Sequence, residues 1–224
     1  MIEILRETRD YTVCIKPCGV LSEESRSGMP GMVNLLAEQS GAPVYPIHRL
    51  DTGVGGVAVY AKTKRAAANL TAQVTDRRME KEYIALVHGT PEAPAAELRD
   101  FLFKDARKNK SYVIKKERKG AKEAILTYET VGRAETKYGP ATLVRVHLVT
   151  GRTHQIRVQF SSRKHPLVGD GKYGGSDNGA SIGLFLRSLS FFDPASGERV
   201  TFSAKPSSAD SPWSEISPLL EVLP

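Results

Sequence analysis

The segment that begins at Pro46 places a basic, an apolar and an acidic side chain directly before a glycine-rich stretch. It reads PIHRLD, continues as TGVGG, and leads into a β-branched run over residues 57–61. Glycines beside a carboxylate let a substrate backbone approach closely. A carboxylate next to an arginine can stay ionised and act as a nucleophile. An Asp in a glycine-rich stretch is also a common turn former, so this segment alone leaves both roles open for Asp51.

Five segments, taken in order along the chain, resemble the motifs of the RluA-type RNA pseudouridine synthases. They are 15–21 (IKPCGVL), 48–51 (HRLD), 81–83 (KEY), 151–157 (GRTHQIR) and 165–174, which contains HPL, GD and YG. The resemblance extends from about residue 10 to residue 206. One short motif would be a weak signal, whereas five in the family's order are specific.

The resemblance implies an isomerisation of uridine in RNA to pseudouridine. The N1–C1′ bond breaks, the uracil turns while it stays bound, and C5 bonds to C1′, without a redox cofactor, a metal or an energy source. Asp51 matches the family's catalytic aspartate. It would either attack C1′, like the nucleophile of a retaining glycosidase, or remove the 2′ proton and pass through a glycal. The sequence leaves both routes open.

The resemblance also assigns roles to other side chains. Arg157 matches the arginine that pairs with the catalytic aspartate and keeps it ionised. Tyr83 matches the tyrosine that stacks under the flipped uracil and can take part in removing the C5 proton. For the histidines, a satisfied structural role is favoured over acid–base catalysis. The residues expected to contact substrate are His48, Arg49, Lys81, Arg152, Thr153, His154, Gln155 and Leu184.

The chain departs from the family pattern at two places. Val54-Gly55 stands where the family usually has Thr-Ser, so hydroxyls are lost near Asp51. Phe185-Leu186 replaces the usual His-Ala pair, which changes the pocket wall, and Leu184 keeps the apolar wall position.

Composition limits the class of protein. With 224 residues, 40% hydrophobic and 25% charged, the chain is typical of a globular protein with one substantial core or two small ones. No apolar run is long enough for a membrane span, and the N-terminus has no signal-peptide pattern. Cys14 and Cys18 have no second pair of thiols for a zinc site. We therefore expect a cytoplasmic monomer that has no metal or cofactor and no membrane association.

A single segment carries an excess of positive charge equal to that of the whole chain. Residues 104–122 contain nine Lys or Arg and two Asp or Glu, and the formal net charge of the chain is +7. Such a segment is expected of a protein that binds a polyanion, here ribosomal or transfer RNA, although a solvated basic loop has the same composition. Phe103 and Tyr112 can stack on bases or belong to the core.

Local patterns predict an α+β fold. Strands are expected over 11–15, 57–61, 81–87, 99–103, 111–114, 124–128, 141–149, 183–191 and 199–202, with an extended segment over 43–51. Helices are expected over 31–38, 64–74 with Thr63 as N-cap, after Thr153 as N-cap with Ile156 and Phe160 facing the core, and within 212–223. We expect a single catalytic domain over 1–224, without an N-terminal accessory RNA-binding domain. Its central sheet would be mixed, mainly antiparallel and bent, with flanking helices and loops and a cleft across it.

Two other functions remain open at this level. The first is an RNA-binding protein that has lost catalysis, although the presence of Asp51, Tyr83 and Arg157 argues against it. The second is a nucleosidase or glycosidase acting on small molecules, which the basic segment disfavours. Incubation with uridine-containing RNA separates the three, because their products are pseudouridine, none and free uracil.

Overall fold

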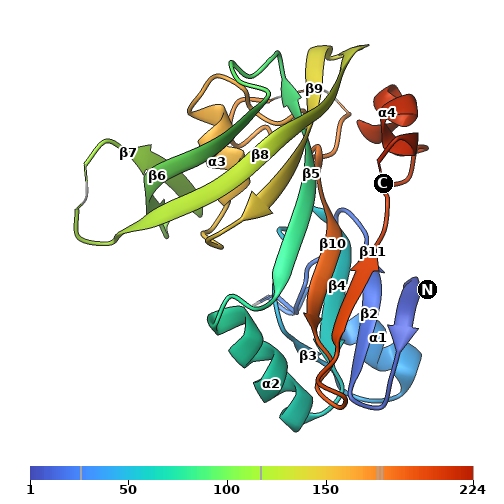
Figure 1. Ribbon diagram of the computed structural model, residues 1–224. Coiled ribbons are helices and arrows are strands. Elements are labelled where there is room, and N and C mark those ends of the chain that lie inside the picture. The colour runs from blue at the N-terminus through green and yellow to red at the C-terminus, as the bar shows by residue number, and fades with distance from the viewer. Residues whose placement is uncertain (26, 117, 176, 178, 224) are drawn as a thin grey trace. The chain divides into compact units, whose positions relative to one another are not determined.

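The computed structural model describes residues 1–25, 27–116, 118–175, 177 and 179–223. These residues form two compact units, and each unit is built from two separate stretches of chain. Unit 1 contains residues 1–81 and 185–206, and unit 2 contains residues 82–184 and 207–224. Figure 1 labels the helices and strands of both units.

Unit 1 is built on a small sheet around β4, whose residues are all buried. Its strands are β1 (Ile4–Glu7), β2 (Tyr11–Lys16), β3 (Tyr45–Pro46), β4 (Gly55–Ala61), β10 (Leu184–Phe192) and β11 (Arg199–Ser203). β4 pairs antiparallel with β2 and β3 and parallel with β10, and the remaining pairings, β1 with β2 and β10 with β11, are antiparallel. The strand pairing is therefore mixed and mainly antiparallel, as predicted.

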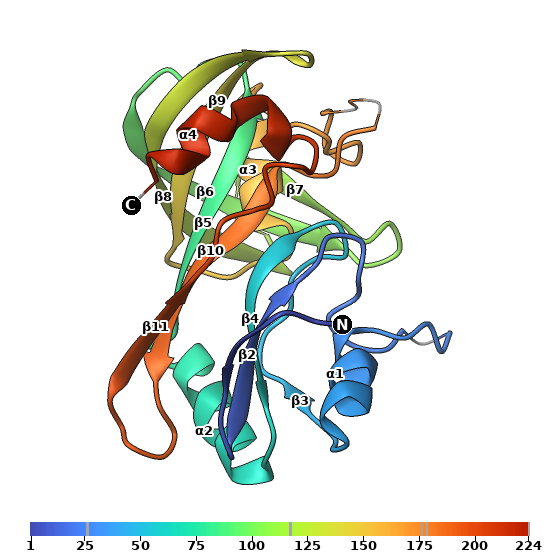
Figure 2. The ribbon, with the colours of Figure 1, turned by 90° about the vertical axis from the view of Figure 1, so that its right-hand side faces the viewer.

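Two helices cover the two faces of this sheet, α1 (Met32–Ser40) and α2 (Lys64–Thr75). Successive side chains of a strand point to opposite faces. Val59 accordingly packs in a cluster with Leu70 of α2, whereas Tyr60 packs with Leu36 of α1. Figure 2 shows α1 and α2 on either side of β2 and β4. Both faces are buried, which explains why β4 is apolar throughout.

Unit 2 is an antiparallel sheet with short helices packed on it. Its strands pair in the order β5 (Glu80–His88), β9 (Gly139–Leu148), β8 (Ala121–Thr136), β6 (Ala95–Asp105) and β7 (Lys110–Ile114). The helices are α3 (Gln155–Ser161), the 3-10 turn η1 (Trp213–Ile216) and α4 (Ser217–Glu221). Val158 of α3 packs with Leu102 and Ala124 of the sheet. Ile156 and Phe160 are buried, so the predicted core stripe of this helix is confirmed.

Several local predictions are confirmed. The Thr63 hydroxyl accepts a hydrogen bond from the Ala66 N–H at 3.2 Å, as an N-cap does. The hairpin of β10 and β11 turns at Asp193, whose carboxylate accepts hydrogen bonds from the two backbone N–H groups of residues 195 and 196 at 2.7 and 3.1 Å. Trp213, Ile216 and Leu220 of the C-terminal helical segment are buried. The single-domain organisation, the bend of the sheet and the cleft stay predictions.

The predicted start of α3 is wrong. The helix begins at Gln155, and its N-cap is His154 at φ 54°, a left-handed conformation, without a side-chain cap. Arg152 and Thr153 therefore precede the helix instead of lying on its faces. The physical reason is tertiary, because both Thr153 and His154 bond to distant residues that are described below. β1 was not predicted either.

None of the helices in the described part of the chain has both the length and the apolar character that a membrane crossing requires. Over the same residues, no three His, Cys, Asp or Glu side chains gather as they would around a metal ion. Cys14 is buried and Cys18 is exposed, and both are free thiols.

Candidate active site

Asp51 lies half-buried in unit 1, in the turn that connects β3 to β4. Its carbonyl oxygen accepts a hydrogen bond from the Val54 N–H at 2.9 Å. The preceding residue, Leu50, is held through both of its backbone groups. The Ser22 hydroxyl accepts from the Leu50 N–H at 3.0 Å and donates to the Leu50 carbonyl at 2.9 Å. The backbone on the N-terminal side of Asp51 is thus fixed by a buried serine.

Lys16, at the end of β2, holds the other side of this turn from within the core. Its side chain is fully buried, and its ammonium donates to the carbonyls of Pro17 at 3.0 Å, Thr52 at 3.3 Å and Val54 at 2.8 Å. Burial lowers the pKa of Lys16 to about 8, while Cys18 and Asp51 oppose that shift. Lys16 is not among the functional residues predicted from the sequence. It belongs to the first motif, IKPCGVL, at the end of a run of strand-forming residues, and this position was its signal in the sequence.

The two departures from the family pattern meet in the structure. The parallel pairing of β4 and β10 places Gly55 opposite Phe185 and Gly56 opposite Leu186. A Cβ on Gly55 would lie 3.4 Å from the Phe185 ring. Gly56 has φ 134°, and a Cβ there would overlap the Leu186 backbone. The close approach of β4 to the β10 backbone therefore requires a glycine at position 56, whereas Gly55 faces the Phe185 ring at ordinary contact distance.

The other predicted site residues of unit 1 differ in exposure. Arg49 is exposed, and its guanidinium lies 2.8 Å from the Glu23 carboxylate. His48 is buried, and within the described part of the chain neither ring nitrogen has a hydrogen-bond partner. Burial, and next the Lys81 ammonium, hold the pKa of His48 well below its usual range. Burial also lowers the pKa of Lys81 to about 8. The expectation of a satisfied structural histidine therefore fails for His48.

Arg157, in α3 of unit 2, is held by a carboxylate that the sequence analysis did not name. Its Nε and Nη2 donate to the two oxygens of Asp170 at 2.6 and 2.7 Å. The side chains of Arg157 and Asp170 are 7% and 0% exposed, so this bidentate pair is buried. The Asp170 carbonyl accepts from the N–H groups of Tyr173 and Gly175, both at 3.0 Å. Asp170 is the aspartate of the GD pair in the last motif, and its place in that motif was the feature of the sequence that could have identified it.

His154 is fixed by Tyr173, a residue of the same motif. The His154 Nδ1 lies 2.8 Å from the Tyr173 hydroxyl, and the two rings meet edge to face with centroids 5.6 Å apart. The left-handed backbone of His154 is unusual for a residue with a side chain. The contact with Tyr173 accompanies this conformation. His154 therefore has a structural partner, in contrast to His48.

The remaining residues of the third motif also bond within the protein. The Gln155 Oε1 accepts from the Arg152 N–H at 2.9 Å, and the Arg152 Nε donates to the Glu123 carbonyl at 2.8 Å. The Thr153 carbonyl accepts from the Ser111 hydroxyl at 2.7 Å. These hydrogen bonds fix the conformation of the segment before α3 and the direction in which the helix begins.

Tyr83 and Leu184 are buried residues of strands. Tyr83 lies in β5 opposite Val146 of β9. Leu184 is the first residue of β10 and is 5% exposed. Asp51 belongs to unit 1, and Tyr83 and Arg157 belong to unit 2. That these three side chains meet around a uridine stays a prediction.

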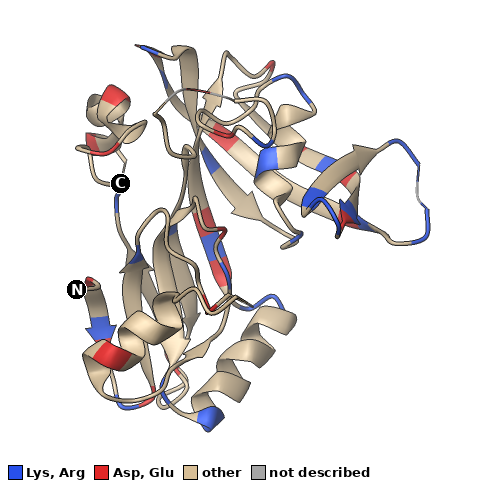
Figure 3. Cartoon of the chain, turned by 180° about the vertical axis from the view of Figure 1, so that it is seen from behind, with Lys and Arg blue, Asp and Glu red and all other residues tan. Residues whose placement is uncertain are grey.

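The basic segment 104–122, which we call the basic ribbon, comprises the ends of β6 and β8, the whole of β7 and the loops between them. Figure 3 shows Lys and Arg gathered along it. The Arg118 guanidinium lies 3.9 Å from the centroid of the Phe103 ring and covers that ring. Tyr112 is 37% exposed. Of the two aromatic candidates for base stacking, Tyr112 therefore keeps the more accessible ring.

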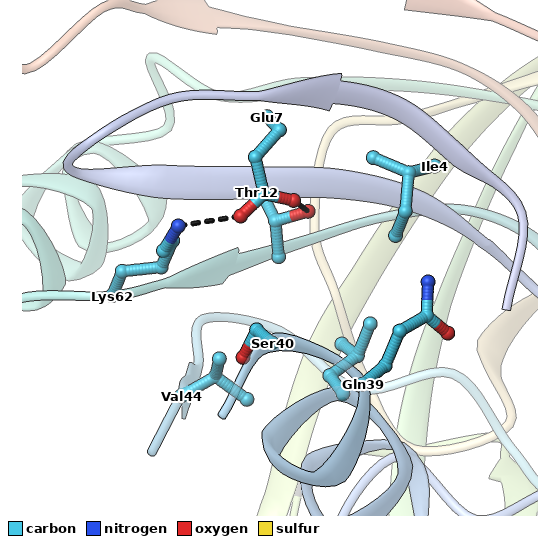
Figure 4. Close-up of a pocket in the computed structure, with 8 residues that line it drawn as sticks. Ile4, Glu7, Thr12, Gln39, Ser40, Val44 and Lys62 are labelled. Carbon is cyan, nitrogen blue, oxygen red and sulfur yellow. Dashed lines mark hydrogen bonds and ion pairs between the residues drawn. The ribbon is translucent and has the colours of Figure 1, made fainter. Parts of the chain in front are cut away.

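A pocket of about 190 Å³ opens elsewhere in unit 1, between α1 and the hairpin of β1 and β2 (Figure 4). Its polar wall contains the Glu7–Lys62 ion pair at 2.5 Å, and its apolar wall contains Ile4, Leu36 and Val44. None of the predicted site residues lines it. The pocket is therefore separate from the Asp51 turn.

Comparison with known proteins adds independent information. Residues 10–162 match the sequence profile of the RNA pseudouridylate synthase family. An "Uncharacterized RNA pseudouridine synthase" of Aquifex aeolicus is 34% identical over 220 residues, which cover 90% of this chain and 68% of that protein. A "Ribosomal large subunit pseudouridine synthase C" of Buchnera aphidicola is 33% identical and covers 90% of this chain and 66% of that protein. This chain thus spans about two thirds of the length of these relatives.

Two further comparisons extend over nearly whole chains. A "tRNA pseudouridine synthase C" of Vibrio parahaemolyticus is 26% identical, and the match covers 96% of this chain and 93% of that protein. The solved structure of "Human RNA Pseudouridylate Synthase Domain Containing 1" superposes with a TM-score of 0.79 at 22% identity, over 100% of this chain and 96% of that one. The α+β fold predicted from the sequence is therefore confirmed.

Proposed function

The chain belongs to the RluA-type family of RNA pseudouridine synthases, which are isomerases, and we propose that it converts specific uridines of ribosomal or transfer RNA to pseudouridine. One observation carries the proposal beyond family membership. The turn that bears Asp51 is held by a fully buried lysine and a buried serine, so the scaffold of the expected catalytic carboxylate is intact. Relatives named for both RNA classes support leaving the class open between them.

In the proposed reaction, the Asp51 carboxylate acts on the ribose of the target uridine. It attacks C1′ as the uracil leaves, or it removes the 2′ proton so that a glycal forms. The uracil then turns and C5 bonds to C1′, while the Asp51–C1′ ester bond breaks in the first route or a proton returns to C2′ in the second. The proton on C5 then leaves and N1 carries one instead, so the product is an isomer of uridine. Arg157 would orient the Asp51 carboxylate. The bidentate pair between Arg157 and Asp170 supports this role, because it fixes the plane of the Arg157 guanidinium. Tyr83 would stack under the uracil while its glycosidic bond is broken.

The target base must leave the stacked helix before this chemistry can occur. Extrusion costs a few kcal/mol, and less in loops and bulges. We assign the positively charged backbone contact to the basic ribbon, whose cations are mostly exposed. The exposed Arg49, next to Asp51, would contact the RNA where the base has left the stack. His48 and Lys81 both belong to unit 1, where the Lys81 ammonium acts on His48, and they complete the proposed substrate contacts.

The decisive experiment uses Asp51→Asn, which keeps the shape of the side chain and removes its charge. The purified protein is incubated with unmodified bulk RNA, and nucleosides are quantified after digestion. We expect pseudouridine from the wild type, none from Asp51→Asn, and RNA affinity within about tenfold of the wild type, since few contacts are lost. The exposed Asp76→Asn in the same unit is the matched control. Full activity of Asp51→Asn would contradict the proposal.

The same assay separates the other functions. Release of free uracil without pseudouridine would indicate a nucleosidase or glycosidase. Tight RNA binding without either product would indicate an inactive RNA-binding protein. Mapping of pseudouridines in the RNA of cells that lack the protein would then identify the target nucleotide.

The role of the basic ribbon is tested by salt dependence. Replacement of Lys108, Lys110, Lys115 and Lys116 by Gln should weaken RNA binding and flatten the dependence of affinity on salt, because fewer counterions are released. The control replaces Lys64, Lys137, Lys164 and Lys205, which are exposed and lie outside the ribbon. An unchanged affinity and salt slope in the ribbon variant would exclude this role.

A further inference from the structure

Tyr173 lies between the basic ribbon and the Arg157–Asp170 pair and contacts both. Its hydroxyl accepts a hydrogen bond from the backbone N–H of Ser111, in β7, at 2.8 Å. The Lys110 Nζ lies 5.1 Å from the centroid of the same ring, and the Arg157 Cζ lies 5.2 Å from it. Tyr173 is 7% exposed. One buried phenol is thus shared by a strand of the ribbon and by the predicted active-site arginine.

The hydroxyl of Tyr173 also joins the ribbon to α3. It lies 2.8 Å from the Nδ1 of His154, the N-cap of the helix that carries Arg157. A phenol oxygen accepts from one partner while its own hydrogen serves another, so a chain from Ser111 N–H through Tyr173 to His154 satisfies both ends. This chain connects two elements that the strand pairing does not connect, β7 and α3.

Neighbouring contacts tie the same two regions together. The Ser111 hydroxyl donates to the Thr153 carbonyl at 2.7 Å, and the Lys172 ammonium donates to the Asn109 carbonyl at 3.1 Å. Tyr173 in turn donates its N–H to the Asp170 carbonyl at 3.0 Å. A displacement of the start of β7 would therefore move the segment 170–173. This segment contains Asp170, the carboxylate that pairs with Arg157.

We propose that Tyr173 is a positioning residue that couples RNA contact at the basic ribbon to the orientation of the Arg157 guanidinium. The inference rests on the proposed function and adds a regulation of that site. RNA phosphates bound by the ribbon fix β7 in one position, and the hydrogen bonds of Tyr173 pass this order to His154, Arg157 and Asp170. A uridine in an RNA that engages the ribbon is then isomerised faster than one that reaches Asp51 without it.

The test must distinguish coupling through the Tyr173 hydroxyl from a purely structural role of the Tyr173 ring. Tyr173 also packs against Leu102 and Val158, so loss of its ring would disturb the core. Tyr173→Phe keeps the ring and removes only the hydroxyl. Tyr128→Phe is its matched control, because Tyr128 is equally buried and packs against Phe160 of α3, while its hydroxyl donates to the Ala93 carbonyl. Lys137→Ala is the matched control for Lys110→Ala, because Lys137 is exposed, lies outside the ribbon, and its Nζ is also 5.1 Å from the centroid of a tyrosine ring, that of Tyr138.

The first test measures single-turnover pseudouridine formation on the RNA transcript that the wild type modifies. Tyr173→Phe and Lys110→Ala should each lower the rate at saturating RNA by roughly threefold to tenfold, whereas the two controls should leave that rate unchanged. The double variant should be no slower than the slower single variant, since both changes break one linkage. Equal rates for Tyr173→Phe and Tyr128→Phe, or effects that multiply in the double variant, would overturn the coupling.

A second readout does not need turnover and separates this inference from the proposed function. In nitrogen-15 spectra, the Nε–H signal of Arg157, identified by its loss in Arg157→Lys, should shift when an oligouridine is added. The shift should be smaller in Tyr173→Phe than in Tyr128→Phe. Equal shifts would refute the coupling whether or not the wild type forms pseudouridine. If Tyr173→Phe does not fold, Lys110→Ala against Lys137→Ala decides, because neither change removes a fully buried side chain.

Discussion

The two charged groups that we expect to meet at the catalytic centre are held in opposite ways. In unit 1, the Asp51 turn is organised by a buried cation, Lys16, that binds main-chain carbonyls. In unit 2, Arg157 is organised by a buried anion, Asp170, that binds its side chain directly. A turn that is held through its backbone tolerates changes of side chain, whereas a guanidinium held through a carboxylate side chain depends on that residue.

The departures near Asp51 illustrate this tolerance. Val54 replaces a residue with a hydroxyl, yet its carbonyl is the oxygen closest to the Lys16 ammonium, at 2.8 Å. The contact uses the main chain, so it survives the substitution. Gly55 faces the Phe185 ring across the pairing of β4 with β10. Around Arg157, by contrast, the interaction uses the side-chain carboxylate of Asp170.

The largest effect is expected where the side-chain pair of unit 2 is broken. Asp170→Asn removes the anion of the buried pair with Arg157, which should lower the free energy of unfolding by about 3–5 kcal/mol. Urea denaturation measures this loss. The control Glu123→Gln breaks an exposed pair with Arg99 and should cost far less stability, because solvent screens that pair. Similar losses for both variants would mean that the Arg157–Asp170 pair does not hold unit 2 as described.

A smaller and more local effect is expected in unit 1. Lys16→Met removes the donor shared by the turn carbonyls, so Asp51 should shift from its working position and kcat/KM should fall by about a hundredfold. Hydrogen exchange of the backbone over residues 52–56 should accelerate, while the rest of unit 1 keeps its protection. Lys62→Met, whose ammonium pairs with Glu7 near the surface, is the control. Normal activity in Lys16→Met would show that the turn keeps its shape without the buried cation.

The smallest effect concerns pH. Burial lowers the pKa of Lys16 to about 8, below its value in the unfolded chain. Between pH 8 and roughly 10.4, the unfolded state binds more protons at this residue than the folded state, so stability should rise with pH by at most about 1.4 kcal/mol per pH unit. The measurement is the difference in unfolding free energy between the wild type and Lys16→Met across this window. A difference that stays constant would mean that Lys16 does not titrate there.

Sequence patterns predicted most elements because these depend on neighbours along the chain. Alternating and continuous apolar runs predicted β4 and β9, and a threonine before an Ala-rich stretch predicted the start of α2. The same reasoning failed at α3. There, Thr153 is a good N-cap by residue type, but its carbonyl is bound by Ser111 and its neighbour His154 is bound by Tyr173. Contacts between distant residues outweighed the local preference.

The sequence by itself determined the family, the likeness of Asp51, Tyr83 and Arg157 to its catalytic residues, and the concentration of charge in residues 104–122. These are carried by residue types and their order along one chain. Only the tertiary structure decided that Lys16 holds the Asp51 turn, that Asp170 holds Arg157, and that Tyr173 joins the basic ribbon to α3. Such partners are chosen by burial and by hydrogen-bond geometry between segments that folding brings together, and these quantities have no counterpart in local sequence spacing.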